Sequence, residues 1–375
     1  MERRLTSRNV SLDWVERGDQ NGDITSTHLI QNTYIRLKLQ YAEKLRQNWV
    51  EQLESPNQVL EQLSLAACLI ELWRSMYGAV PATEQEQSSK STALFPGFVD
   101  LACGNGILVY ILLMEGYNGL GFDACRRKSW ETFPTEVQEF LKERIFIPRP
   151  FADVLDQGIG VEIHTGDFPD NTFIISDHAD ELTVWTPIMA ALSSPSSPLP
   201  FFVVPCCSRS LAGSSYRYPP PKGANGDPAG KVDDDAIEQN LQPASGDLRA
   251  LRAMKMEEKT ERGFLNSMIG SLAAKTMSIA EEIGVDVEKI WLRTPGAINM
   301  ALIGNRQQVT RRWTENLTPR DSQTKRGQGD AVLNKISEVV ERECSKDGGV
   351  QLAAKLWVER TKILHQGQGI THKAN

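Results

Sequence analysis

Apolar residues near the start of the chain recur at the spacing of a helix. A stripe that repeats every four residues keeps its members on one face of a helix, which we expect from about Thr27 to Leu53. The stripe consists of Leu37, Tyr41, Leu45 and Trp49. Ser55 and Pro56 then offer a cap and a first-turn proline to a second helix, which is apolar through its centre. Polar sequence flanks these helices, so we expect over residues 1–25 an arm that is either loose or ordered on contact, and a linker over 81–93.

Short apolar runs separated by helix-length segments replace this pattern after the linker. Runs of this kind are typical of strands that are buried on both faces of a parallel sheet. The expected strands are 98–101, 119–123, 172–176 and 199–205, with a further strand from either 145–151 or 161–168. Helical sequence is expected over 107–115 and again from about Lys128 to Arg144. The alternation of strands and helices predicts an α/β fold with a mostly parallel sheet.

The last part of the chain contains a polar interruption, a helix and a hairpin. Residues 209–256 are rich in proline, glycine and aspartate, so we expect a flexible insertion there. An amphipathic helix from about Glu257 to Ile283 ends at Gly284, and a β-hairpin that turns at Pro295–Gly296 follows it. The expected division is an N-terminal arm and helical extension at 1–90, an α/β domain at 91–305, and a basic C-terminal region at 306–375.

Composition and charge limit what the chain can do. Of its 375 residues 40% are hydrophobic, so a sizeable core can form. The formal net charge of −7 argues against a protein that coats nucleic acid by bulk charge, and any RNA contact would need a local basic patch. The six cysteines show neither a CxxC pair nor zinc-type spacing with histidine, so we expect reduced thiols and no metal. Without a signal peptide or a membrane-length apolar stretch, the chain is expected to act in the cytoplasm, away from membranes.

The most informative segment is FVDLACGNG at residues 98–106. A strand that leads through a glycine turn into a helix brings backbone close to a ligand and directs the helix N-terminus at it. The spacing fits neither GxGxxG nor GxxxxGK(S/T), which weakens a dinucleotide or P-loop interpretation. The segment resembles instead the first motif of Rossmann-like S-adenosylmethionine-dependent methyltransferases; an ordinary strand–turn–helix junction is the alternative. In that class the acid organises the loop, and the glycines make room for the methionine part of the cofactor. The residues that this resemblance assigns to the cofactor are Asp100, Ala102, Cys103, Gly104, Asn105 and Gly106.

Acidic residues follow other predicted strands, at the edge where doubly wound sheets bind ligands. Asp123 ends the second strand, and its carboxylate could accept two hydrogen bonds from ribose hydroxyls. The alternative for this residue is a plain loop acid. Asp167, in the segment TGDF, could similarly approach the adenine amino group. Both residues are therefore candidates for cofactor binding.

A cluster of titratable residues follows the fourth strand, in the segment SDHADELT. Placing three carboxylates and an imidazole close together costs free energy unless the groups are solvated or serve a function in the site. Either the segment is a solvated loop in which Asp180 caps the next helix, or it lies where a methyl acceptor meets the cofactor. The cluster consists of Asp177, His178, Asp180 and Glu181. Cys206 and Cys207 follow the fifth strand, where adjacent cysteines are more often packing groups than nucleophiles or ligands.

Two basic stretches are candidates for contact with RNA. Arg126, Arg127 and Lys128 lie at an expected helix start, where positive charge is unfavourable unless an anion such as phosphate is nearby. A solvated helix start is the alternative for this run. The second stretch has few acids in opposition and consists of Arg306, Arg311, Arg312, Arg320, Lys325 and Arg326.

Four blocks in this order and spacing resemble the eukaryotic tRNA (uracil-2′-O-)-methyltransferase family: FVDLACGNG, DACRRKSW, SDHADELTVWTP and VVPCC. The resemblance covers about residues 32–304, apart from the insertion. It implies a Rossmann-like fold, S-adenosylmethionine as cofactor, and methyl transfer to the ribose of uridine-44 in serine tRNA. It also implies that Asp177 is near the cofactor and that tRNA meets Arg126, Arg127 and Lys128. The chain departs from the family where Asp177-His178 replaces Asn-His and where the insertion after Cys207 is unusually long.

Methyl transfer to a ribose hydroxyl requires in-line alignment, which supplies about 7–11 kcal/mol of the barrier in favourable cases. A positioned base would add about 10²–10⁴-fold. The candidates for this base are Asp180, Glu181 and His178, of which we favour Asp180. Two rival interpretations stay open. One is a methyltransferase with a protein or small-molecule acceptor, and the other is a methyltransferase-like subunit that binds RNA or a partner protein without catalysis.

Overall fold

The computed structural model describes residues 26–52, 54–85, 95–153, 163–221, 261–294, 297–315 and 326–366. The expectations for the arm at 1–25, for most of the linker and insertion, and for the turn at Pro295–Gly296 lie outside these ranges. Among the described helices, none combines the length and the apolar character that crossing a membrane requires.

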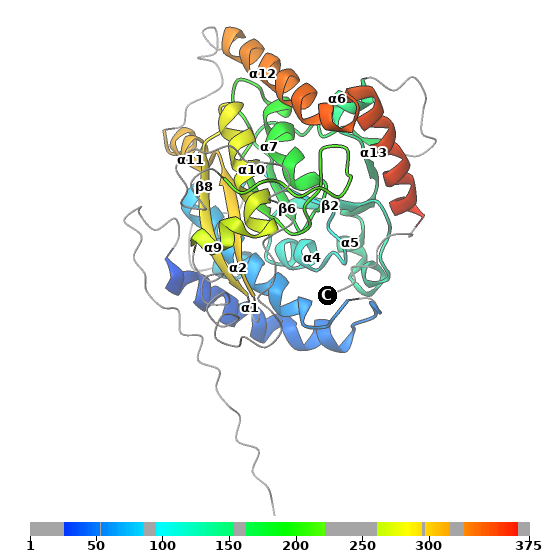
Figure 1. The fold of residues 1–375 in the computed structure, drawn as a ribbon. Helices are drawn as coiled ribbons and strands as arrows, with labels where there is room; N and C mark the ends of the chain where they lie inside the picture. Colours follow the sequence, from blue (N-terminus) through cyan, green and yellow to red (C-terminus); the bar gives the residue numbers. More distant parts are fainter. Residues whose placement is uncertain are drawn as a thin grey trace, which may run out of the picture.

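A seven-stranded sheet forms the centre of the described part (Figure 1). Its strand order is β3-β2-β1-β6-β7-β9-β8. Neighbours from β3 to β7 run parallel, and the β8–β9 hairpin adds two antiparallel strands at one edge. The strands are β1 (Phe98–Leu101), β2 (Gly119–Asp123), β3 (Leu141–Glu143), β6 (Phe173–Asp177), β7 (Phe201–Val204), β8 (Val287–Thr294) and β9 (Ala297–Gly304). The expected α/β Rossmann-like fold with a C-terminal antiparallel hairpin is confirmed.

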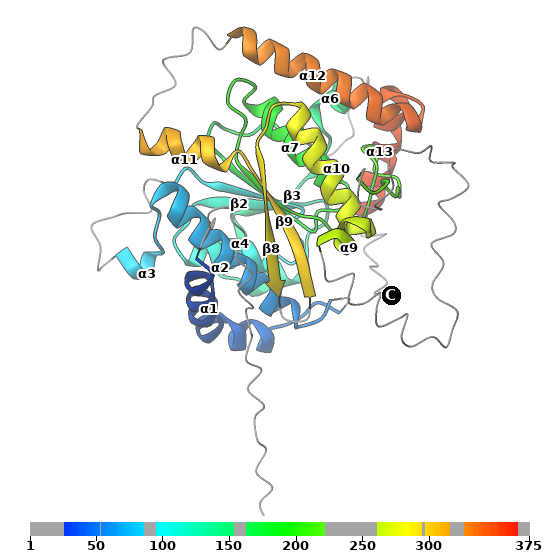
Figure 2. The same cartoon turned by 60° about the vertical axis from the view of Figure 1, so that its left-hand side comes forward.

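Side chains of the central strands alternate between two apolar clusters, because successive Cβ atoms of a strand point to opposite faces of the sheet. In β6, Phe173 and Ile175 pack into one cluster and Ile174 into the other. Figure 2 shows the two helix layers that cover these faces, with α1, α2 and α4 on one side of the β8–β9 hairpin and α7 and α10 on the other. The helices of the first layer are α1 (Thr27–Gln47), α2 (Gln58–Tyr77), α4 (Ile107–Met114) and α11 (Arg306–Thr314). The second layer contains α7 (Leu182–Ser193), α10 (Met268–Glu282), α12 (Arg326–Cys344) and α13 (Val350–His365).

The N-terminal helical extension packs directly on the sheet. The Trp73 ring of α2 is fully buried, and its centroid lies 5.6 Å from that of Phe98 in β1. The Glu115 carboxylate, just after α4, is buried and accepts hydrogen bonds from Arg36 (2.7 Å) and Tyr41 (2.8 Å) of α1. Apolar burial and a buried ion pair therefore both hold the extension in place.

The C-terminal helices pack on the opposite layer. Trp357 of α13 is buried, and its Nε1 donates a hydrogen bond of 2.7 Å to the Phe146 carbonyl oxygen. The centroid of its ring lies 6.2 Å from that of Trp185 in α7. The segment expected as a basic C-terminal region, 306–375, also contributes apolar side chains to the core through α12 and α13.

Two expectations between the second and fourth strands are wrong. The third strand of the sheet is β3, and the segments 145–151 and 161–168 supply a separate parallel pair instead. That pair consists of β4 (Ile145–Phe146) and β5 (Ile163–His164). The helix expected over 128–144 is divided, because Pro134 cannot donate the backbone hydrogen bond that would continue it. The segment forms a 3-10 turn (Lys128–Thr132), the short helix α5 (Thr135–Gln138) and then β3.

Other boundaries also shift. Helix α1 ends at Gln47, before the expected Leu53. The amphipathic helix is interrupted at Ser267, whose Oγ accepts a hydrogen bond of 3.0 Å from Gly270 N and caps α10. The beginning of the expected insertion is packed, since Leu211 and Tyr218 are buried. The remaining short helices are α3 (Ala82–Gln85), α6 (Arg149–Ala152), α9 (Glu261–Asn266) and the 3-10 turn Ser345–Asp347.

Candidate active site

Three carboxylates gather at the carboxyl ends of the strands where the strand order reverses between β1 and β6. Asp100 lies in β1, Asp123 ends β2 and Asp177 ends β6. Burial first, and then the charges of Asp177 and Asp123, raise the pKa of Asp100 well above its ordinary value. The fold thus brings together three acids that the sequence assigns to the cofactor.

Asp100 is the most deeply buried of these acids. It is 2% exposed, and its Oδ1 has no hydrogen-bond partner among the described residues. An unpaired buried carboxylate is costly, and a ligand that brought a cationic amine to this point would supply the missing donor. S-adenosylmethionine has such an amine at its methionine end, so the site fits the cofactor that the sequence implies.

The loop between β1 and α4 adopts left-handed backbone at three positions. Ala102, Gly104 and Gly106 have φ angles of 56°, 52° and 73°. A Cβ atom on Gly106 would lie 3.1 Å from side-chain atoms of Leu141 and Trp130, so a larger residue would have to push these side chains aside. The glycines therefore permit a turn that brings this backbone to the reversal point.

Backbone donors hold the carboxylate of Asp123. Its Oδ2 accepts a hydrogen bond of 3.0 Å from Gly104 N, and its Oδ1 accepts one of 3.0 Å from Cys125 N. Cys103 is buried, and its N–H donates to the Phe122 carbonyl oxygen at 3.1 Å, which ties the loop to β2. Each carboxylate oxygen has a second acceptor position, so Asp123 can still accept ribose hydroxyls.

The residues after the basic run clamp the glycine loop from outside. Trp130 Nε1 donates to the Gly104 carbonyl oxygen at 2.9 Å, and Ser129 Oγ donates to the Asn105 carbonyl oxygen at 2.8 Å. Trp130 is fully buried, so this clamp forms away from solvent. Both residues belong to the block DACRRKSW. The sequence analysis singled out only Asp123 and the basic run in this block.

The helical extension also holds the loop, which sequence reasoning missed. Asn105 Nδ2 donates to Glu54 Oε2 at 2.9 Å and to Gln58 Oε1 at 3.1 Å. Gln62, one turn further along α2, donates from Nε2 to Asp177 Oδ2 at 2.9 Å. The spacing of the two glutamines places them on one face of a helix, and this polar pair on an apolar helix is the signal that could have identified them.

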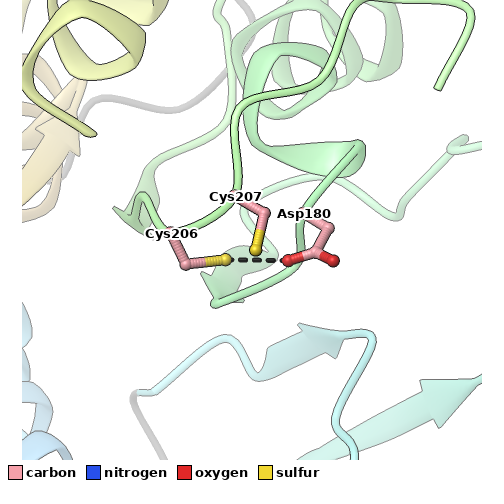
Figure 3. Close-up of side chains that lie close together, drawn as sticks. All are labelled: Asp180, Cys206 and Cys207. Carbon is pink, nitrogen blue, oxygen red and sulfur yellow. Dashed lines mark hydrogen bonds between the residues drawn. The ribbon is translucent and has the colours of Figure 1, made fainter. Parts of the chain in front are cut away.

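The acidic cluster after β6 divides between two environments. His178 and Asp180 have φ angles of 51° and 44°, which turn the chain sharply before α7. Asp180 is half-buried, and its Oδ1 accepts a hydrogen bond of 2.8 Å from the Cys206 thiol (Figure 3). Glu181 is buried instead, and accepts bonds of 2.9 Å and 3.2 Å from the Arg360 guanidinium of α13. Of the three candidate bases, Asp180 and the exposed His178 are accessible, and Glu181 is held in an ion pair.

Asp167 lies after β5, outside the main sheet. It is exposed, and it accepts hydrogen bonds from Arg149 at 3.2 Å and from Thr165 at 2.9 Å. These partners connect it to α6 and to the residue that follows β5, and its contact with adenine stays a prediction.

The three residues of the first basic run differ in their exposure to solvent. Arg126 and Lys128 are exposed, and the Arg126 guanidinium carbon lies 5.8 Å from the centroid of the Trp130 ring. Arg127 is half-buried, with its Nη1 3.8 Å from Glu54 Oε1. Arg126 and Lys128 are thus exposed to solvent, whereas Arg127 lies beside Glu54, which holds the glycine loop through Asn105.

Part of the second basic stretch is neutralised within the chain. Arg306 forms two hydrogen bonds with Glu288, of 2.5 Å and 2.7 Å, and Arg311 pairs with Glu315 at 3.1 Å. Arg320 and Lys325 lie outside the described residues.

Residues 24–148 match a family model described as "Predicted AdoMet-dependent methyltransferase". That match contains the glycine loop, Asp100 and Asp123, and it names the cofactor that the sequence predicted.

The chain is also similar to fungal proteins named tRNA (uracil-O(2)-)-methyltransferase. A relative from Aspergillus oryzae is 51% identical over 376 residues, which cover 97% of this chain and 59% of that protein. A relative from Neurospora crassa is 37% identical, over 74% of this chain and 47% of its own length. One from Schizosaccharomyces pombe is 36% identical, over 76% of this chain and 48% of its own length. The chain therefore spans about half of the length of the curated relatives it matches, and the family resemblance that its motifs indicated is confirmed.

Proposed function

We propose that this chain, a homologue of the fungal proteins named tRNA (uracil-O(2)-)-methyltransferase, contains the catalytic part of such an enzyme. It transfers a methyl group from S-adenosylmethionine to the ribose 2′-hydroxyl of a uridine in tRNA, and we assign uridine-44 of serine tRNA as the acceptor. The observation that carries the proposal is the glycine loop bounded by Asp100, Asp123 and Asp177 at the reversal of the strand order.

The residues around this loop would hold S-adenosylmethionine, whose sulfonium centre supplies an electrophilic methyl group. The carboxyl groups of Asp100 and Asp177 provide acceptors for the methionine amine, and Asp123 provides acceptors for the ribose hydroxyls. The hydrogen bonds from Gln62 to Asp177 and from Gly104 N to Asp123 orient these carboxylates before a ligand arrives. Because the groups are already placed, little binding energy is lost in ordering them.

The loop after β6 would receive the acceptor. Asp180 follows Asp177 by three positions, is reachable from solvent, and can take the proton of the ribose hydroxyl. His178 is the second candidate for this proton. Glu181 acts as a positioning residue, because its ion pair with Arg360 joins the start of α7 to α13. Alignment of the hydroxyl contributes the larger part of the rate, and proton removal the smaller.

Exposed cations beside the site would bind the tRNA backbone. Arg126 and Lys128 lie within five positions of Asp123, so a phosphate that they hold is close to the ligand-binding edge of the sheet. All six cysteines lie within the described residues and none forms a disulfide there, which fits action in a reducing compartment such as the cytoplasm.

Transfer of labelled methyl groups from S-adenosylmethionine to unmodified serine tRNA tests the proposal. The matched control is the same tRNA with cytidine in place of uridine-44, and the digested nucleosides are identified by mass spectrometry. We expect 2′-O-methyluridine only from the tRNA with uridine at this position. We expect none from Gly104→Val, because a β-branched residue at a φ angle of 52° strains the glycine loop.

Each other outcome revises a different part of the proposal. Methylation of both tRNAs would move the acceptor to another uridine. Cofactor binding in calorimetry without transfer to any tRNA would overturn the assignment of the acceptor. A chain that bound no S-adenosylmethionine would overturn the enzyme itself and leave an RNA-binding or partner-binding subunit.

A further inference from the structure

We propose that Asp180, Cys206 and Cys207 form a binding site for a divalent transition-metal ion, with zinc as the best match. Each residue offers one ligand atom, and the three atoms lie within 4.8 Å of one another. Figure 3 shows both sulfur atoms lying beside the Asp180 carboxylate. The sequence favours packing groups and no metal at these cysteines, and the geometry points to a different role.

The sheet creates this cluster. Asp180 follows β6 and the two cysteines follow β7, and the two strands pair in parallel register from Ile174↔Phe201 to Asp177↔Val204. The pairing continues one step beyond the strands, since His178 N donates to the Val204 carbonyl oxygen at 3.2 Å. The loops that leave the carboxyl ends of parallel strands begin at the same edge of a sheet, so residues 26 positions apart become neighbours.

The donor set matches zinc chemistry. Thiolate sulfur and carboxylate oxygen are both common zinc ligands, at about 2.3 Å and 2.0–2.2 Å from the metal. Two such atoms at a tetrahedral angle are about 3.6 Å apart, by the same bond lengths. Cys206 Sγ and Asp180 Oδ1 are 2.8 Å apart, bridged by the thiol proton. Loss of that proton and an outward movement of less than about 1 Å would therefore admit the ion.

The electrostatics of the cluster favour a cation. A carboxylate and two thiols whose ligand atoms lie this close together can bind one divalent ion, which takes the deprotonated forms and releases the thiol protons. All three residues are half-buried, so an ion can reach them from solvent.

Three protein ligands leave the fourth tetrahedral position open, as in zinc sites that bind a water or a substrate oxygen. We assign this position to a hydroxyl oxygen of the acceptor, an assignment that rests on the proposed function because Asp180 lies on the acceptor side. The carboxylate can serve both roles, since Oδ1 would bind the metal and Oδ2 would accept the proton.

Metal content tests the site without reference to activity. The full chain is purified without chelators or a metal-affinity tag, and zinc is quantified by mass spectrometry. Cobalt is then exchanged for zinc, because thiolate ligands give charge-transfer bands in the absorption spectrum. Cys206→Ser, Cys207→Ser and Asp180→Asn are compared with Cys125→Ser, a half-buried cysteine of the same chain that lies outside the cluster.

We expect nearly equimolar zinc in the parent chain and in Cys125→Ser, loss of most of it in the two cluster cysteine variants, and an altered cobalt spectrum in Asp180→Asn. Zinc retained equally in all variants would overturn the site. So would a correctly folded parent chain that binds neither zinc nor cobalt, or a Cys206–Cys207 disulfide that gives no metal binding after reduction. The parent chain's cobalt spectrum decides the question even where a variant fails to fold. Calorimetry with S-adenosylmethionine on the same samples reports separately on the proposed function.

Discussion

Gln62 of α2 donates a hydrogen bond of 2.9 Å from Nε2 to Oδ2 of Asp177, a residue 115 positions later in the chain. The bond crosses from the helical extension to the carboxyl end of β6 and holds one of the three carboxylates at the candidate cofactor site. The extension is therefore part of the site, although its sequence carries no recognisable cofactor motif.

Gln62→Leu should weaken the binding of S-adenosylmethionine about tenfold, because a partly buried charged acceptor loses its donor at a cost of about 1–3 kcal/mol. Calorimetry measures the affinity. Gln47→Leu is the matched control, since Gln47 donates a similar hydrogen bond to Glu43 on the exposed surface of α1. Equal affinities for the two variants would remove Gln62 from the site.

Asp100→Asn should stabilise the ligand-free protein at neutral pH while abolishing cofactor binding. Burial, then Asp177 and Asp123, raise the pKa of Asp100, so the folded state holds its proton more tightly than the unfolded state does. The parent chain therefore gains stability below the unfolded-state pKa and loses it as the pH rises through the folded-state pKa. The asparagine variant should lack this decline, which urea unfolding across that pH range would reveal. Asp170→Asn, at an exposed aspartate, serves as control and should follow the parent curve.

Asp180→Asn and Glu181→Gln should affect different properties, the first catalysis and the second stability, although the residues are adjacent. We expect Asp180→Asn to lower kcat about 10²–10⁴-fold with little change in thermal stability, because it removes the proposed base. Glu181→Gln should lower the free energy of unfolding by about 1–3 kcal/mol, because it leaves the Arg360 guanidinium without its charged partner. Single-turnover kinetics and thermal unfolding measure the two effects. A loss of kcat in Glu181→Gln at unchanged stability would exchange the two roles.

Arg126→Ala should weaken tRNA binding and leave cofactor affinity intact, since the side chain is exposed. The slope of log affinity against log salt should fall by about one for each phosphate that the variant no longer neutralises. Arg127→Ala should also weaken cofactor binding, because Arg127 lies beside Glu54, which holds the glycine loop through Asn105. Filter binding at several salt concentrations, together with calorimetry, separates the two effects. Equal losses of both affinities in Arg126→Ala would contradict this division.

Local pattern determined much of the fold. The runs that became β1, β6 and β7 are mainly apolar because both faces of these strands are covered by helices, and such runs are visible without any tertiary information. β3 escaped recognition because it is an edge strand in which only Leu141 is buried and the two residues after it are exposed. The helix expected over 128–144 was wrong for another reason. The pattern of this segment indicated one helix, but Pro134 divides it.

The sequence by itself determined the glycine loop, the acids that end the strands, and the family to which they point, because these features depend on residues close together in the chain. Only the tertiary structure decided which distant groups complete the site. Gln62 reaches Asp177, Arg360 holds Glu181, and Cys206 meets Asp180 through contacts that span from 26 to 179 positions. Such contacts follow from parallel strand register and from the packing of helices on the sheet, which local patterns of polarity do not encode.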